Sequence, residues 1–279
     1  HSAMRTGIGA AATPSHTQAV VLLLDGEDSS SPSLLATNAA LALAQYLAAL
    51  VSASHLTILT CGGRGSKAAH GGSWGLARVL RLEHASLHTQ SVDLVRGPEA
   101  TAAILGPAME DEAAWRGRTC NVARLRECST GSMQAGHAIQ GLYTVTGGLG
   151  GLGLRAATLL IDSGARRVLL ASRSGRVVRD GQGLETQLQA LGSAGKVVAC
   201  DSADACDVKA LIFPHLPSGV LHAAGAGDKG LLSELAARRV GWLQASKALG
   251  AWHMHCVSAA TPLETLVLFS SVGSGLGNI

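Results

Sequence analysis

The sequence predicts an α/β protein built around parallel sheets, and three observations lead to this fold class. Short β-branched apolar segments alternate with helical patterns along most of the 279 residues, which is the layout of sheets covered by helices. The strand pattern at residues 143–146 breaks into a run of glycines and is followed at once by a helical pattern. Apolar residues make up 47% of the chain and charged residues 15%, as in a folded globular protein with ample core.

The N-terminal half contains strand and helix patterns in alternation, without a glycine fingerprint. We predict strands at residues 19–24, 56–60, 91–95 and 119–125, and helices at residues 34–51, 73–85 and 99–114. A glycine- and serine-containing stretch, residues 128–136, separates this half from the next. We therefore expect one domain over residues 1–139 and a second over residues 140–279.

The C-terminal half alternates more regularly. Strands are predicted at residues 142–146, 167–171, 196–200, 219–222 and 265–269, with helices between them and the last helix running from about residue 234 to residue 254. Right-handed crossovers between such strands give a doubly wound parallel sheet of the Rossmann type. The last strand is apolar along its length, which predicts burial on both faces and a further neighbour, so the sheet is expected to be incomplete at the C-terminus.

The glycine run is the most informative part of the chain. A strand, a glycine turn and a helix in this order lay a pyrophosphate on a helix N-terminus, because glycines let the backbone approach the phosphates. In a chain with 35 glycines the fingerprint alone is weak evidence, but the flanking strand and helix are the context that the motif needs. No Lys-Ser or Lys-Thr follows, which excludes a P-loop. The residues concerned are Thr146, Gly147, Gly148, Gly150, Gly151 and Gly153.

The end of the next predicted strand indicates which nucleotide binds. An NAD site carries an acidic residue near this point, which accepts from the ribose 2′-hydroxyl. The sequence has no carboxylate between Ser163 and Val178, and Arg173 follows the strand instead. The guanidinium group of Arg173 would pair with a 2′-phosphate, which favours NADPH as the cofactor. The missing acidic residue also argues against an FAD site. The alternative is a solvated surface arginine.

Composition excludes several other classes of protein. A net charge of +3, with basic residues spread along the chain, does not indicate nucleic-acid binding. The six cysteines have no metal-ligand spacing and the histidines are scattered, so no metal site is expected. No secretion signal or membrane span is visible, and we expect a cytoplasmic protein with reduced cysteines. The chain begins at His1 and ends at Ile279 within a glycine loop, and we expect both ends to be cuts through a longer polypeptide.

These motifs occur together in one known family. T-G-G-L-G-G-L-G (146–153), L-A-S-R-S-G (170–175), A-C-D (199–201), H-A-A-G (222–225) and F-S-S-V (269–272) follow the order found in short-chain dehydrogenases. The C-terminal half specifically resembles the ketoreductase domain of modular type I polyketide synthases. The N-terminal half resembles the truncated Rossmann-like structural subdomain of the same ketoreductases, which is catalytically silent. Its markers are S-W-G-L-A-R-V-L-R-L-E-H (73–84), V-D-L (92–94) and A-R-L (123–125).

The resemblance implies roles for individual cofactor-binding residues. Gly147, Gly151 and Gly153 would form the pyrophosphate turn, lined by Gly148 and Gly150. Arg173 with Ser172 would hold the 2′-phosphate. Asp201, with Ser202 beside it, would bind the adenine amino group, although Asp201 could instead be a helix N-cap. The small residues Ala223, Ala224 and Gly225 would let the ribose and nicotinamide pass close to the backbone.

The resemblance also implies a ketone reduction in which hydride leaves the nicotinamide for the carbonyl carbon. Ser271 would hold the carbonyl oxygen, and Ser270 is the neighbour that could be confused with it. Lys247 would hold the ribose and lower the pKa of a tyrosine that donates the proton. That tyrosine and the asparagine after it are expected beyond Ile279, so we expect the chain alone to be inactive.

The resemblance gives the following expectation for the whole protein. It would use NADPH to reduce a β-ketoacyl thioester on an acyl carrier protein, alongside other polyketide synthase domains of the same polypeptide. Two alternatives stay open at this stage: a catalytically inactive structural ketoreductase in a megasynthase, or a fatty-acid synthase ketoreductase. Chain length, α-substituent and hydroxyl stereochemistry of the substrate are not indicated.

Overall fold

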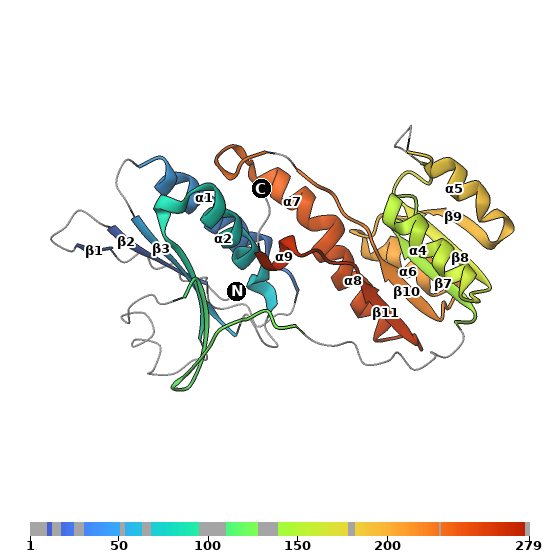
Figure 1. Ribbon diagram of the computed structural model, residues 1–279, viewed down its shortest axis with the longest axis horizontal. Helices are drawn as coiled ribbons and strands as arrows, with labels where there is room; N and C mark the ends of the chain where they lie inside the picture. The colour runs from blue at the N-terminus through green and yellow to red at the C-terminus, as the bar shows by residue number, and fades with distance from the viewer. Residues whose placement is uncertain are drawn as a thin grey trace. The chain divides into compact units, whose positions relative to one another are not determined.

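The computed structural model describes residues 10–12, 18–24, 31–50, 54–62, 68–94, 110–127, 139–177, 182–228 and 230–276. The chain divides into two compact units (Figure 1). The first unit contains residues 1–127, 229–240 and 271–279, and the second contains residues 128–228 and 241–270. The functional division at residues 139 and 140 stays a prediction.

The first unit is built on a six-stranded sheet with the strands in sequence order. Its strands are β1 (Ala10–Ala12), β2 (Gln18–Leu24), β3 (Ser54–Cys61), β4 (Thr89–Leu94), β5 (Glu112–Arg116) and β6 (Thr119–Asn121). Strands β2 to β5 run parallel, and β1 and β6 are antiparallel edge strands. The strands predicted near residues 19–24, 56–60 and 91–95 are confirmed.

Two helices cover one face of this sheet. They are α1 (Leu34–Ala48) and α2 (Gly71–Glu83), and the short turns η1 (Ala68–His70) and η2 (Ala85–Leu87) flank α2. Buried alanines and leucines of both helices pack on alternate residues of β2 and β3, among them Leu24, Leu56 and Ile58. Leu59, Val92 and Leu94 form a smaller cluster from β3 and β4.

The helix predicted over residues 99–114 is wrong at its C-terminal end. Residues 99–109 lie outside the described residues, but residues 112–114 belong to strand β5. Ala113 and Ala114 are buried there, and β5 pairs with β4 on one side and β6 on the other. Tertiary pairing thus overrides the helix propensity of the two alanines. Gly117, at φ +60°, makes the tight turn into β6, which ends earlier than the predicted strand over 119–125.

Two later segments of the chain belong to the first unit through specific contacts. Residues 229–240 include the turn η4 (Leu232–Glu234), whose Leu232 carbonyl accepts from Gln45 at 2.8 Å. The Leu232 amide donates to Glu83 at 2.7 Å, and Val240 joins the same core. The other segment carries the short helix α9 (Gly273–Leu276).

The second unit holds a fully parallel five-stranded sheet in the order β11-β10-β7-β8-β9. The strands are β7 (Leu142–Thr146), β8 (Arg167–Ser172), β9 (Gly195–Ala199), β10 (Gly219–His222) and β11 (Thr265–Leu268). The helices are α4 (Gly151–Asp162), α5 (Leu184–Ala190), α6 (Ala205–Ile212) and α8 (Gly250–Ser258), with the turn η3 at Gly192–Ala194. The five strands predicted for this half are confirmed.

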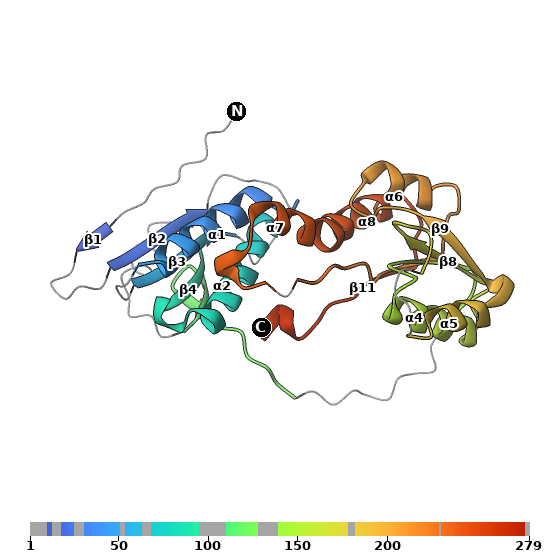
Figure 2. The same cartoon turned by 90° about the horizontal axis from the view of Figure 1, so that it is seen from above.

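Helices cover both faces of this sheet, as predicted for a doubly wound fold. Val168 and Leu170 of β8 pack with α4 and α5, whereas Leu169 and Ala171 pack with α6 and α8. Figure 2 shows the two pairs of helices on opposite sides of the strands. The strict alternation along β8 is the pattern of a strand buried on both faces.

Strand β11 lies at the edge of this sheet, with Val267 40% and Leu268 49% exposed. An apolar strand at an open sheet edge is what the expectation of an incomplete sheet implies. The prediction for the last helix needs correction. The last helix, predicted as continuous, consists of α7 (Ala237–Gln244), the π-helical turn η5 (Ala245–Leu249) and α8.

Candidate cofactor site and catalytic residues

A cavity of about 730 Å³ lies where β7, β8, β9 and β10 end in the second unit. Ligands of open α/β sheets bind at the carboxyl ends of the strands, so the position is the expected one. Every residue predicted to bind the cofactor lines this cavity except Gly148. Leu149, Leu152, Ser174, Arg176, Cys200 and Ser246 also line it and were not predicted.

The glycine turn between β7 and α4 tolerates no side chain at three positions. Gly147 has φ +67°, and a Cβ there would lie 2.7 Å from the Ala223 carbonyl carbon. A Cβ on Gly153 would lie 2.3 Å from the Gly147 oxygen. A Cβ on Gly148 would lie 2.8 Å from the Leu170 Cα, which explains why Gly148 packs behind the turn and not in the cavity.

Gly151 differs from the three glycines that backbone atoms crowd. The nearest atom to a Cβ at this position, in the side chain of Leu184, would be 4.0 Å away. Its lack of a side chain therefore leaves room on the cavity side. Helix α4 begins here with Gly150 as N-cap, which has no side chain to accept from the first amides, and its first turn has no acidic residue. Both features suit an anion at the helix N-terminus.

The residues after β8 place positive charge at the cavity. Arg173 is exposed and has no hydrogen-bond or ion-pair partner among the residues that the structure describes. Ser172 Oγ accepts from the Gly175 amide at 3.1 Å, and Ser174 Oγ donates to the Arg176 carbonyl at 3.0 Å. These bonds close a tight turn that carries two arginines, Arg173 and Arg176, beside the cavity.

The alternative role of Asp201 as a helix N-cap is wrong. Asp204 caps α6 instead, accepting from the amides of Cys206 at 2.7 Å and Asp207 at 3.1 Å. These two hydrogen bonds lower the pKa of Asp204, because they favour its charged form. Asp201 Oδ1 accepts from the Ala203 amide at 3.0 Å and lines the cavity, where it is the one carboxylate among the lining residues.

Lys247 lies in the π-helical turn η5 next to the cavity. A Cβ on Gly225 would lie 3.1 Å from the Lys247 Cε, so the aliphatic part of the lysine packs directly against this cavity residue. The hydroxyl of neighbouring Ser246 lines the cavity and is buried without a hydrogen-bond partner in the part of the chain that the structure describes. Single π-helical turns occur often at functional sites.

His222 links the glycine turn to the lysine turn, a role that the sequence did not reveal. Its Nδ1 lies 2.7 Å from Thr146 Oγ1, and its Nε2 lies 3.4 Å from the Lys247 carbonyl oxygen. A proton on Nε2 lets the ring accept from Thr146 and point a donor at the Lys247 carbonyl. Burial lowers the pKa of His222, and backbone contacts with Lys247 and Ser246 oppose this in part. Gly250 is required beside the ring, since a Cβ would lie 2.7 Å from His222 Cε1.

Ser271 belongs to the first unit by its contacts, whereas Ser270 and Lys247 belong to the second. Its hydroxyl accepts from the Gly273 amide at 3.2 Å, and the serine is exposed. Ser271 lines a second cavity of about 760 Å³, which lies within the first unit. The structure thus brings Lys247 to the predicted cofactor residues and describes Ser271 in a separate unit.

The described residues fit a dinucleotide. Within the described ranges, no three side chains of the metal-binding types come together. The cradle around Gly147 and Gly153, the lone hydroxyl of Ser246 and the arginine beside the cavity suit phosphates and ribose. In the same described ranges, no helix has the length and apolarity to cross a membrane.

Comparison with known proteins gives a consistent result. A family model described as the KR domain matches residues 141–279. Polyketide synthase GfsB from Streptomyces halstedii is 32% identical over 92% of this chain, and the pikromycin polyketide synthase component PikAIII from Streptomyces venezuelae is 32% identical over 71% of it. The alignments cover 5% and 13% of those two proteins.

Solved structures agree with the sequence relatives. The structure of A-type ketoreductases from a modular polyketide synthase superposes with a TM-score of 0.75 at 32% identity, covering 89% of this chain and 56% of that one. The first ketoreductase of the tylosin polyketide synthase gives a TM-score of 0.75 at 28% identity over 88% of this chain and 57% of its own. Fold, motifs and relatives agree, and the chain belongs to the ketoreductase domain family of the polyketide synthases.

Proposed function

We propose that this chain is part of an NADPH-dependent ketoreductase that reduces a β-ketoacyl thioester, carried by an acyl carrier protein, to the β-hydroxyacyl thioester. The supporting observation is the cavity at the strand ends, in which a glycine cradle, a helix N-terminus and an arginine without a partner among the described residues adjoin one another. Ketoreductase domains of this family are NAD(P)-dependent reductases, and the choice of NADPH rests on Arg173.

The proposed cofactor contacts follow from the cavity. The amides at the start of α4 and the glycine turn would bind the pyrophosphate, and Arg173 with Ser172 would bind the 2′-phosphate. Asp201 and Ser202 would bind the adenine end. The segment Ala223, Ala224 and Gly225 leaves room for the ribose and nicotinamide, and bound NADPH supplies the hydride.

The proposed catalytic residues act on charge that develops at the carbonyl oxygen. Ser271 would donate a hydrogen bond to that oxygen, and the Lys247 ammonium would bind the ribose and favour proton transfer. Neither of the chain's two tyrosines lines the cavity, because Tyr46 lies in α1 and Tyr143 in β7. The described residues therefore supply no tyrosine as proton donor. The proposed proton donor is the tyrosine expected in the longer polypeptide, and a structural ketoreductase without activity is the alternative that a turnover measurement on that polypeptide tests.

The proposed setting is a large synthase in the cytoplasm. The relatives are multidomain polyketide synthases many times longer than this chain. Other synthase domains and an acyl carrier protein are therefore the proposed partners. A fatty-acid synthase would present the same chemistry, and the polyketide setting is preferred because the relatives named above are polyketide synthases.

Two measurements test the proposed function. The chain itself should bind NADPH more tightly than NADH in a fluorescence titration. Because the chain spans 56% of the solved ketoreductase, turnover is measured on a longer polypeptide that contains this sequence and has the length of those ketoreductases. NADPH oxidation with a β-ketoacyl thioester, and a β-hydroxyacyl product by mass spectrometry, are expected. Binding of NADPH without any turnover would instead support the structural candidate.

A further inference from the structure

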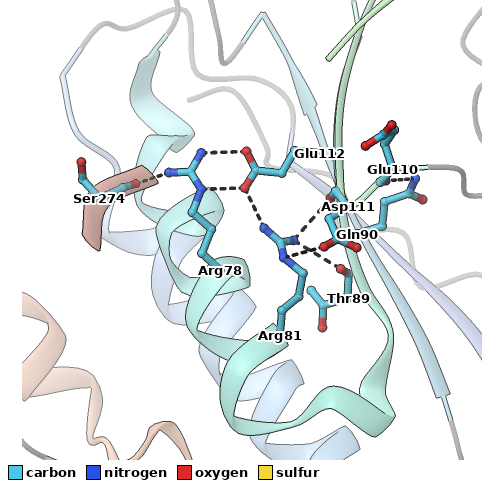
Figure 3. A network of polar contacts seen from close by, with 8 residues as sticks. All are labelled: Arg78, Arg81, Thr89, Gln90, Glu110, Asp111, Glu112 and Ser274. Carbon is cyan, nitrogen blue, oxygen red and sulfur yellow. Dashed lines mark hydrogen bonds and ion pairs between the residues drawn. The ribbon is translucent and has the colours of Figure 1, made fainter. Parts of the chain in front are cut away.

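An arginine of the first unit holds the turn that carries Ser271. Arg78 of α2 forms a two-pronged ion pair with Glu112 of β5, with Nε 2.6 Å from Oε1 and Nη2 2.8 Å from Oε2. Both side chains are mostly buried, with 17% and 15% exposed. Figure 3 shows the guanidinium and the carboxylate facing each other in parallel. A paired fork of this kind fixes the plane of the guanidinium as well as its charge.

The remaining nitrogen of the fork reaches the Ser271 turn. Arg78 Nη1 donates to the backbone carbonyl of Ser274, as Figure 3 shows. Ser274 in turn is tied to Ser271, because its amide donates to the Ser271 carbonyl at 3.0 Å and its hydroxyl donates to the same oxygen at 2.6 Å. The Gly273 amide donates to the Ser271 hydroxyl at 3.2 Å. The chain of contacts therefore runs from Glu112 through Arg78 and Ser274 to Ser271.

Arg81 provides an internal comparison. It lies one helical turn after Arg78, and its Nη2 is 2.6 Å from the same carboxylate of Glu112. It also donates to the carbonyls of Thr89 and Asp111, both at 3.3 Å, and its Nε lies 3.8 Å from Asp111 Oδ2. The structure thus holds two arginines on one acid, and Arg78 is the one that donates to the turn carrying Ser271.

We propose that Arg78 is a positioning residue for the reduction, and that it sets the place of the Ser271 hydroxyl by holding the Ser274 carbonyl. The proposal rests on the proposed function, in which Ser271 binds the carbonyl oxygen. It gives the catalytically silent subdomain a part in the chemistry, because α2 and β5 supply both members of the ion pair. Lysine could keep the charge at position 78 but not the fork that joins Glu112 and Ser274 at once.

The test uses the longer, active polypeptide with Arg78→Lys and Arg78→Ala, and with Arg81→Ala as matched control. A shift of about 1 Å in a catalytic group can cost about 100-fold in rate. We expect both Arg78 variants to lower kcat by about 10- to 100-fold with unchanged NADPH affinity. Arg81→Ala loses an ion pair with the same acid and should keep kcat within about twofold, even at an equal loss of melting temperature. Equal kcat values in the Arg78 and Arg81 variants would overturn the proposal.

A double variant separates positioning from general destabilisation. If Arg78 acts through Ser271, Arg78→Lys should lower kcat in the wild-type background and have no further effect in the Ser271→Ala background. If the double variant lowers kcat by the product of the two single losses, Arg78 acts elsewhere and the positioning role is overturned. If Ser271→Ala itself leaves kcat unchanged, the proposed role of Ser271 fails and the Arg78 proposal fails with it. If Ser271→Ala lowers kcat but the Arg78 variants leave kcat unchanged, only the Arg78 proposal is overturned.

Discussion

The two units are built alike and differ in how they hold charge. Each has a mostly or wholly parallel sheet with helices packed on it, and each has a cavity of similar size. In the first unit, Arg78 and Arg81 share Glu112, and Arg124 pairs with Glu110. In the second unit, Arg173 beside the cavity has no partner among the described residues.

This difference teaches how to tell a structural arginine from a binding one. A guanidinium that is largely buried needs a carboxylate or carbonyls around it, since its desolvation is costly without them. Such an arginine has its donors committed and holds parts of the chain together. An exposed arginine beside a glycine turn keeps its fork for a ligand. The same residue type therefore supports architecture in one unit and is proposed to bind the cofactor in the other.

The largest expected effect is a loss of kcat when one proposed catalytic residue is replaced in either unit. Ser271→Ala should lower kcat of the longer polypeptide by about 10²–10³, the usual cost of losing one donor to a developing oxyanion. Lys247→Ala should also lower kcat severely. Neither change should shift the melting temperature, because both side chains are exposed. Ser270→Ala is the control, and a loss of kcat in that variant rather than in Ser271→Ala would move the assignment to Ser270.

The contrast between paired and unpaired arginines can be sharpened by cofactor titration. Arg173→Ala should weaken NADPH binding by about 1.5–3 kcal/mol, the value of a hydrogen-bonded contact with a charged group, and leave NADH binding unchanged. Arg124→Ala removes an arginine paired with Glu110 in the first unit and should change neither affinity. Equal weakening of NADPH and NADH by Arg173→Ala would contradict binding of the 2′-phosphate.

The glycines of α2 and α4 make a third comparison between the units. Gly75 in α2 has open space where a Cβ would stand, whereas Gly153 in α4 has the Gly147 oxygen 2.3 Å from that point. Gly75→Ala should raise the free energy of unfolding by about 0.5–1 kcal/mol, because alanine has the higher helix propensity. Gly153→Ala should lower it by about 1–3 kcal/mol through overpacking and weaken NADPH binding. Urea titrations of both variants measure whether the free energy of unfolding rises or falls. A Gly153→Ala variant that is stable and binds NADPH normally would contradict the proposed role of the crowded glycine turn.

The parts of the fold that the sequence predicted well are those with local patterns. Strands β7 and β10 were predicted to the residue, since each is a short apolar run bounded by a glycine or polar residue. Strand β5 was missed because Glu-Ala-Ala-Trp-Arg contains helix formers, and only its pairing with β4 and β6 makes it a strand.

The candidate site likewise has parts that the sequence could predict and parts that it could not. The cofactor residues follow motifs that are contiguous in sequence, so they could be named in advance and gather at one cavity. The π-helical turn around Lys247, the lone hydroxyl of Ser246 and the link through His222 depend on packing between distant segments. The contact from Arg78 to Ser274 spans 196 residues, which no local pattern could reveal.

The smallest expected effect is the pH dependence of the free energy of unfolding that the buried ring of His222 causes. The network of arginines and acids between α2 and β5 contains no such histidine. Burial lowers the pKa of His222 below its ordinary value of 6.5. Above that value the ring is neutral in both the folded and the unfolded chain. As the pH falls through it, the unfolded chain takes up the proton first and the folded chain does not, so the free energy of unfolding decreases until the lower folded pKa is reached. The slope from this one group is at most about 1.4 kcal/mol per pH unit. His222→Gln keeps polar atoms near Thr146 without this titration, and it should flatten the dependence below about pH 6.5 in urea titrations. An unchanged slope in His222→Gln would show that another group carries the acid sensitivity.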